Sequence, residues 1–291
     1  PPRSTLFPYT TLFRSQSDPN THHVVKALSS LELLVVQEIF MTETAKLAHV
    51  VLPGASFLEK EGTFTNGERR IQRVQRVVEP VGDCKPDGQI LVEMMNRLGY
   101  PQRPYTAKGM LEEISQIVPF FAGVRWEELG DNGKQWPVAP DGTDTKILHQ
   151  ESFKRGKGRF VFREFVETKE ILDYAQDFPY ILTTNRVLEQ YNAGTMTRRT
   201  PNVQIVSEDL LLIHPQDAAD NRIAQGDFVR IESARGECKV KAHLTDEVKP
   251  GILSTTFHFP ELMVNNVTSD VHDSIANCPE YKVVSVRIER V

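Results

Sequence analysis

The chain has 291 residues, of which 40% are hydrophobic and 25% charged, an ordinary composition for a globular protein with room for two domains. Its formal net charge of −5 argues against nucleic acid as a partner, and no apolar run reaches the roughly 18 residues of a membrane helix. Cys84, Cys238 and Cys278 form no CxxC pair, so we expect neither a zinc or iron–sulfur ligand set nor a disulfide framework.

Residues 1–16 read PPRSTLFPYTTLFRSQ and differ in character from the rest of the chain. The stretch has no Met, no acidic residue and no periodicity that would bury one face. Its composition is like that of a transit peptide. Its order of residues resembles even more closely the translation of a sequencing adapter. We therefore expect residues 1–16 to be non-native and the native sequence to begin near Ser17, in the middle of a domain.

Residues 17–150 show the pattern of an α/β segment. Leu31–Gln37 and His49–Leu52 are short apolar runs that predict strands, and Thr42–Ala48 between them predicts a short helix. Strand, helix and strand in close succession indicate part of a parallel sheet, in which ligands lie beyond the carboxyl ends of the strands. The segment Phe40–Thr44 occupies such a position.

The rest of this segment predicts a hairpin and two helices. Asn66-Gly67 between extended stretches favours a type I′ hairpin turn, with positive φ at both residues. Asp87–Leu98 has one apolar face and is followed by Gly99, which predicts a helix with a glycine cap. Thr106 is a suitable N-cap for a second helix that extends to Val118.

Residues 151–177 are interpreted as a linker or hairpin, and residues 178–291 as a β-barrel. Many short strands with a single helical crossover are typical of a compact barrel. The expected strands are Tyr180–Thr184, Leu210–Ile213, Phe228–Ile231, Cys238–Leu244, Ile252–Phe257 and Val283–Ile288.

Three short segments of the predicted barrel contain residue types that could bind a ligand. In 192–199, a glycine, threonine hydroxyls and arginine forks suit a phosphate, although a basic surface loop has the same composition. In 257–268, the amides of Asn265 and Asn266 suit the edge of a guanine or pterin, although they equally stabilise turns. In 278–282, Tyr281 can stack on a heterocycle and Lys282 can neutralise a phosphate, although the stretch also fits a plain strand start.

Taken together and in this order, the segments resemble the molybdopterin oxidoreductase family. FMTETAKLAHVVLP and EKEGTFTNGERRIQ are similar to the end of that family's α/β domain. TTNRVLEQYNAGTMTRR, HPQDAADNRIAQGDFVRIESARGECKVKAHLT, TFHFPELMVNNVTSDVHD and PEYKVVSVRIE are similar to its dinucleotide-binding barrel, a double-psi fold. Arg222 departs from the family pattern, in which a small or acidic residue is usual at that turn.

The segments GTMTRR, HFPE and PEYK point more narrowly to formate dehydrogenase α subunits. The resemblance implies a molybdenum or tungsten ion held by two molybdopterin guanine dinucleotides, and oxidation of formate to carbon dioxide. It further implies electron-transfer subunits or NAD-linked diaphorase subunits as partners, and a cytoplasmic location. The implied cofactor contacts are Gly194, Thr195, Met196, Thr197, Arg198, His258, Asn266, Tyr281 and Lys282, with Thr42, Thr44, Gly62 and Asn66 from the α/β part.

The family's metal-bound Cys or selenocysteine and its iron–sulfur cysteines have no counterpart in this sequence. We therefore expect a C-terminal fragment with no catalytic residue and no metal ligand, inactive toward formate when alone. Other interpretations stay open. A nitrate reductase or the large iron–sulfur subunit of respiratory complex I shares these features, a non-catalytic barrel module would share the fold, and a mis-assembled reading frame would have no product.

Overall fold

The computed structural model describes residues 14–273 and 275–291. Its internal contacts divide the chain into two compact units. The first unit combines the chain through Val51 with Glu164–Val291, and the second is Leu52–Arg163. Stretches at the two ends of the sequence therefore fold together in the first unit.

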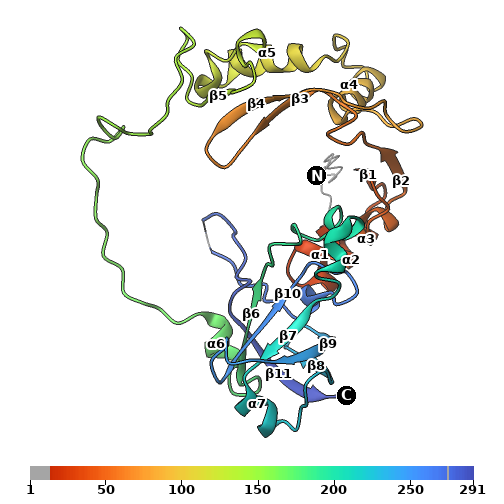
Figure 1. Ribbon diagram of the computed structural model, residues 1–291, viewed down its shortest axis with the longest axis vertical. Helices are drawn as coiled ribbons and strands as arrows, with labels where there is room; N and C mark the ends of the chain where they lie inside the picture. Colours follow the sequence, from red (N-terminus) through yellow and green to blue (C-terminus); the bar gives the residue numbers. More distant parts are fainter. Residues whose placement is uncertain (1–13, 274) are drawn as a thin grey trace. The chain divides into compact units, whose positions relative to one another are not determined.

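A closed barrel forms the centre of the first unit (Figure 1). Alternate residues of its strands point inward, so that Val229, Ile231, Val240 and Ala242 are buried in one core. The expected α/β segment followed by a β-barrel is confirmed. In barrel order the strands are β10 (Ile252–Thr256), β6 (Tyr180–Asn185), β11 (Val284–Arg290), β8 (Phe228–Glu232), β9 (Glu237–Leu244) and β7 (Leu210–Ile213).

Two parallel strands, β6 and β10, decide where the loops of the barrel meet. Their register pairs Ile181 with Ile252 and Asn185 with Thr256, so both strands finish side by side. The antiparallel strand β7 begins at that end. At the opposite end lies the helix α7 (Pro215–Asp220), where the Gly251 N–H donates to the Asp217 carboxylate at 2.8 Å. The loops that follow β6 and β10 are therefore neighbours, far from α7.

Short elements from the start of the chain belong to the same unit. They are α1 (Arg14–Ser17), α2 (Thr21–Ser29), β1 (Val35–Glu38), α3 (Glu43–Lys46) and the first half of β2 (Val50–Pro53), which the division at Val51 splits. The order β1, α3, β2 confirms the predicted strand–helix–strand order. Residues 1–13 of the predicted non-native start lie outside the described residues. Ser15 and Gln16 belong to the same predicted start, yet both are buried in this unit.

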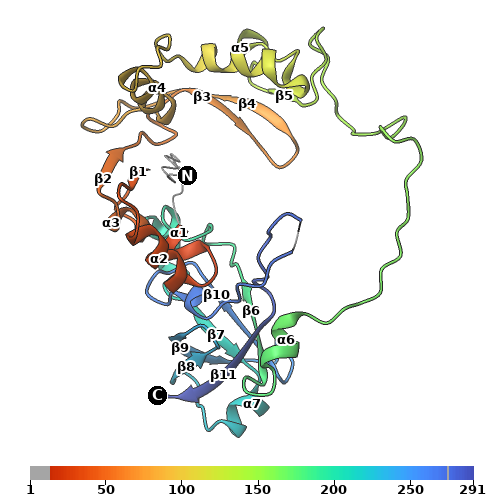
Figure 2. The ribbon, with the colours of Figure 1, turned by 180° about the vertical axis from the view of Figure 1, so that it is seen from behind.

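The second unit contains a β-hairpin and two helices, with α5 packed on β3 (Figures 1 and 2). The predicted hairpin is confirmed, but the type I′ turn is wrong. Four residues separate the strands, and the positive φ of 67° falls at Arg69. The reason is that the Asn66 side chain accepts from the N–H groups of Glu68 and Arg70 and so holds a longer turn. The elements are β3 (Gly62–Thr65), β4 (Arg70–Val74), β5 (Lys134–Gln135), α4 (Asp87–Arg97) and α5 (Ala107–Ile117).

Several short helices were not predicted. The helix α6 (Lys169–Tyr174) lies within the predicted linker, begins at the N-cap Thr168, and packs on β11. The 3-10 helices are η1 (Pro119–Phe121), η2 (Trp126–Glu128), η3 (Thr197–Arg199), η4 (Pro201–Gln204) and η5 (Val264–Asn266). Within the described ranges, every helix is too short or too polar to cross a bilayer.

Candidate functional site

His258 joins the two loops that follow β6 and β10. Its side chain is fully buried, and its Nδ1–H donates to the carbonyl oxygen of Asn192. Its Nε2 accepts from the Val187 N–H at 3.1 Å. This pattern requires the neutral ring with its proton on Nδ1. Both nitrogens of His258, predicted as a cofactor contact, are therefore occupied by backbone of the neighbouring loop.

Gly194 is the point at which the same two loops touch. Its φ is 64°, and a Cβ built on it would lie 2.5 Å from the carbonyl oxygen of His258. Any side chain would therefore collide with backbone, which cannot move aside cheaply. The close contact that requires a glycine here is made with the His258 backbone, and a contact of Gly194 with a ligand stays a prediction.

The residues after Gly194 stabilise their own loop. The Thr197 hydroxyl donates to Gln190 Oε1 at 2.6 Å and accepts from the Tyr191 N–H at 3.1 Å. Thr195 is buried, and its carbonyl oxygen accepts from Arg199 Nη1. Met196 remains 45% exposed. Met196 is thus the most exposed side chain of this predicted group, and Arg198 is partly exposed.

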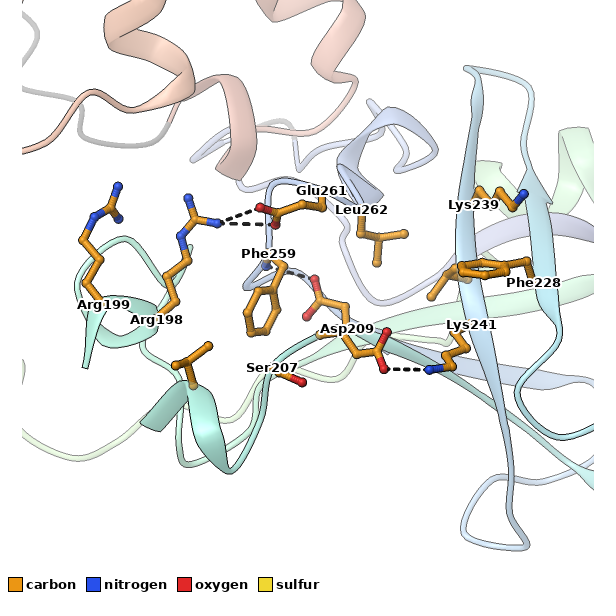
Figure 3. A pocket seen from close by; sticks show the side chains of 13 residues that line it. Arg198, Arg199, Ser207, Asp209, Phe228, Lys239, Lys241, Phe259, Glu261 and Leu262 are labelled. Atoms are coloured by element: carbon orange, nitrogen blue, oxygen red, sulfur yellow. Dashed lines mark hydrogen bonds and ion pairs between the residues drawn. The ribbon is translucent and has the colours of Figure 1, made fainter. Parts of the chain in front are cut away.

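Arg198 and Arg199 bring positive charge to a pocket of about 600 Å³ that is also lined by the turn 259–262 and by residues of β8 and β9 (Figure 3). Arg198 Nη1 lies 3.2 Å from Glu261 Oε1. The guanidinium of Arg199 lies 4.3 Å from the ring centre of Phe40, so the predicted Phe40–Thr44 segment reaches this loop. The remaining charged and aromatic lining includes Glu208, Asp209, Phe228, Lys239, Lys241 and Phe259.

Tyr281 and Lys282 lie at the end of β6. The Tyr281 hydroxyl donates to the carbonyl oxygen of Ser17 at 2.9 Å, and burial raises the pKa of this phenol to about 12. The Lys282 ammonium donates to the carbonyl oxygen of Thr184. Partial burial lowers the pKa of Lys282, and the nearby Arg186 lowers it further. Lys282 and Arg186 thus both lie at the end of β6.

Arg186 was not singled out in the sequence. It follows β6 directly, and its guanidinium lies 5.0 Å from the ring centre of Phe257 on the neighbouring loop. Its position, one residue beyond a strand that leads into a glycine-containing loop, is the signal that could have identified it.

The start of the chain closes this end of the barrel. Gln16 Nε2 donates to the carbonyl oxygens of Ala193 at 3.3 Å and Phe257 at 3.2 Å. The buried Asn265 donates from Nδ2 to the carbonyl oxygen of Gln16 at 2.6 Å. Of the two predicted amides, Asn265 is thus the one tied to this contact, and the Asn266 carbonyl instead faces Gly236.

The four residues predicted from the α/β part fall into two groups. Thr42 caps α3 and accepts from the Ala45 N–H at 3.2 Å, and the Thr44 hydroxyl lies 2.9 Å from Ser15 Oγ. Both belong to the unit that holds the barrel. Gly62, at the start of β3, and Asn66, in the hairpin turn, belong to the second unit. The first unit therefore brings together the loop 194–198, His258, Tyr281 and Lys282 around the ends of β6 and β10.

Comparison with known proteins agrees with this arrangement. Residues 180–285 match the model of the molydopterin dinucleotide binding domain, and residues 10–97 match that of molybdopterin oxidoreductases. The barrel is therefore of the molydopterin dinucleotide-binding class. The chain therefore contains domains of the molybdopterin oxidoreductase family.

Two curated relatives are formate dehydrogenase subunits. The F420-dependent formate dehydrogenase subunit alpha of Methanocaldococcus jannaschii is 42% identical over 281 residues, with 94% of this chain and 42% of that protein covered. The F420-dependent formate dehydrogenase 2 subunit alpha of Methanococcus maripaludis is 39% identical, with 94% and 41% covered. The chain thus spans less than half the length of these relatives.

A solved structure supports the fold. The acetylene hydratase of Pelobacter acetylenicus superposes with a TM-score of 0.69 at 20% identity, and the match covers 94% of this chain and 42% of that one. At this identity the likeness concerns the fold alone.

Proposed function

We propose that this chain is the C-terminal, cofactor-binding part of a formate dehydrogenase alpha subunit. The cofactor would be a bis-molybdopterin guanine dinucleotide that carries molybdenum or tungsten. The observation that carries the proposal is that Arg186, directly after β6, and Lys282, whose ammonium donates to the Thr184 carbonyl oxygen of β6, both lie at one end of a barrel that matches a dinucleotide-binding domain. Cations gathered at one end of the barrel would attract and bind the pyrophosphate of a dinucleotide.

The residues at the barrel end fit such a group. Arg186 and Lys282 would neutralise pyrophosphate, and Arg198 would add a guanidinium fork if it releases the exposed Glu261. Tyr281 and Met196 would cover planar parts of the cofactor, and the amide of Asn266 would meet a guanine or pterin edge. When bound, the metal and its pterins supply the redox chemistry that converts formate to carbon dioxide.

Other predicted residues would act through the loops. Thr195, Thr197, Gly194 and His258 hold the shape of the loop after β6, which orients Arg198. Thr42 and Thr44 hold α3 in the same way. Gly62 and Asn66 remain proposed contacts supplied by the second unit.

The complete enzyme is part of the same proposal. The metal ligand and an iron–sulfur cluster would come from chain outside this sequence, and electrons would leave through partner subunits in the cytoplasm. The support is that the two relatives named as alpha subunits are more than twice as long as the matched region.

Formate-dependent reduction of a viologen dye tests this function. The longer polypeptide, produced in a host that makes the cofactor, is expected to reduce the dye with formate, while residues 1–291 alone are expected to be inactive. Nitrate-dependent oxidation of reduced dye without any formate activity would assign a different substrate. A longer polypeptide that contains no pterin would contradict the proposal and favour a non-catalytic barrel module.

A further inference from the structure

A buried carboxylate, Asp209, lies immediately before β7 and beneath the turn that follows β10 (Figure 3). It is only 6% exposed. Its Oδ1 accepts from the Thr256 hydroxyl and from the His258 N–H at 3.2 Å, and its Oδ2 accepts from the Phe259 N–H at 3.0 Å. Three donors from one four-residue stretch thus converge on a single carboxylate.

The contacts of Asp209 continue into the loop after β6. Asp209 fixes the backbone of His258, and the His258 ring in turn binds Asn192 and Val187 through its two nitrogens. The carbonyl of the same histidine is the atom that Gly194 approaches. Displacement of the His258 backbone would therefore disturb both the ring contacts and the packing of Gly194.

Burial of a charged carboxylate costs free energy, so a buried aspartate is expected where its hydrogen bonds are needed. Burial raises the pKa of Asp209, while the hydrogen bonds from Thr256, Phe259 and His258 act in the opposite direction. A neutral amide could not replace it, because one of its two ends would present hydrogen atoms to a backbone N–H. The site thus requires two acceptor oxygens on one short side chain.

We propose that Asp209 is the positioning residue of the cofactor loops: through His258 it sets the loop 187–197 against the turn 256–261. This inference rests on the proposed function for its effect on cofactor, but the coupling of the two loops is a property of the chain itself. Asp209 contacts no cofactor in this scheme and acts through His258.

Hydrogen–deuterium exchange of the full chain, compared between Asp209→Asn and the parent, tests the coupling. We expect exchange about tenfold faster in both 256–261 and 187–197, because the turn and the loop share one anchor. Faster exchange in 256–261 with parental exchange in 187–197 would overturn the proposal, as would parental exchange in both. If Asp209→Asn fails to fold, Thr256→Val removes a single donor to the same carboxylate. It is expected to give the same pattern at smaller amplitude, and parental exchange in 187–197 would again overturn the proposal.

Asp217→Asn is the matched control. Asp217 is equally buried, at 6% exposure, and also anchors a backbone N–H, but at the opposite end of the barrel. Its substitution is expected to speed exchange near Gly251 and to leave 187–197 unchanged. Equal acceleration of 187–197 by both variants would show a general loss of stability and overturn the specific role of Asp209.

Cofactor content gives the second readout. In the longer polypeptide, Asp209→Asn is expected to lower the pterin nucleotide content about tenfold relative to Asp217→Asn. Equal content in the two variants would overturn the link to cofactor binding. A parent protein with no pterin nucleotide would instead refute the proposed function, and the exchange data would still decide whether Asp209 couples the loops.

Discussion

Glu170 of α6 and Arg235 form a buried bidentate ion pair, with Oε1–Nη1 at 2.8 Å and Oε2–Nη2 at 2.6 Å. Their side chains are 0% and 7% exposed. Glu170 Oε1 also accepts from the Ser285 N–H at 2.9 Å, so the pair ties α6 to β11. The helix at the end of the linker is thereby fixed to the barrel.

Removal of one partner of this pair should be costly. Glu170→Gln leaves the buried Arg235 guanidinium with only the exposed carboxylate of Asp270, at 3.3 Å, as a counter-charge, and we expect a loss of about 3 kcal/mol in the free energy of unfolding. Glu232→Gln is the control, because its pair with Arg287 is partly exposed and should be worth about 1 kcal/mol or less. Urea unfolding followed by circular dichroism measures both, and equal losses would contradict this account.

Gly194→Ala tests the contact between the two loops. Both Gly194 and Gly226 have positive φ, but a Cβ at Gly226 would meet nothing within 4 Å. Gly226→Ala should therefore cost only the backbone strain of about 1–2 kcal/mol. Gly194→Ala adds a collision with His258 and should cost clearly more. Thermal unfolding midpoints compare the two, and an equal shift would show that the loops do not depend on this contact.

Most elements with a local signal were predicted from the sequence, although the helix α2 with its N-cap Asn20 was not, and elements that depend on distant residues were missed. The barrel strands, the hairpin, the N-cap Thr106 and the glycine after α4 follow from alternation, turn chemistry and capping, all of which are local. The helix α6 is short, and its key residue Glu170 is buried by Arg235, which is 65 residues away. No local pattern reports such a partner.

The residues of the candidate site likewise fall into those predicted from the sequence and those that only the folded structure reveals. The resemblance singled out the loop 192–199 and Tyr281–Lys282, which the fold brings to one end of the barrel. The resemblance could not show that both ring nitrogens of His258 are hydrogen-bonded to backbone, or that Asp209 accepts from the His258 N–H. Both contacts depend on loops that meet only in the folded chain.

Tyr281 should ionise late. Because its pKa is raised from 10.0 to about 12 in the folded chain, the folded state keeps a proton that the unfolded state loses. Tyr281 therefore contributes stability up to about pH 10 that is lost as the pH rises toward 12. Tyrosinate absorbance of the parent minus that of Tyr281→Phe should show one group that titrates near pH 12. A difference that titrates near pH 10 would contradict the buried position.

The three cysteines should differ in reactivity. Cys238 is buried in the barrel, and burial raises the pKa of its thiol to about 12, whereas Cys278 is exposed. A maleimide should label Cys278 first and should reach Cys238 only after denaturation. Peptide mapping by mass spectrometry identifies the labelled thiol, and rapid labelling of Cys238 in the native chain would contradict its burial in the barrel core.

Arg198→Ala in the longer polypeptide tests the central claim most directly, through the molybdenum or tungsten and the pterin nucleotide bound per chain. Arg230→Ala is the matched control, because Arg230 also pairs with an exposed glutamate, Glu289. Arg230 lies on β8 and not in the loop after β6. We expect the Arg198 variant to lose most of its metal and nucleotide while the Arg230 variant keeps the parental content. Parental metal and nucleotide content in Arg198→Ala would contradict the cofactor site at this end of the barrel.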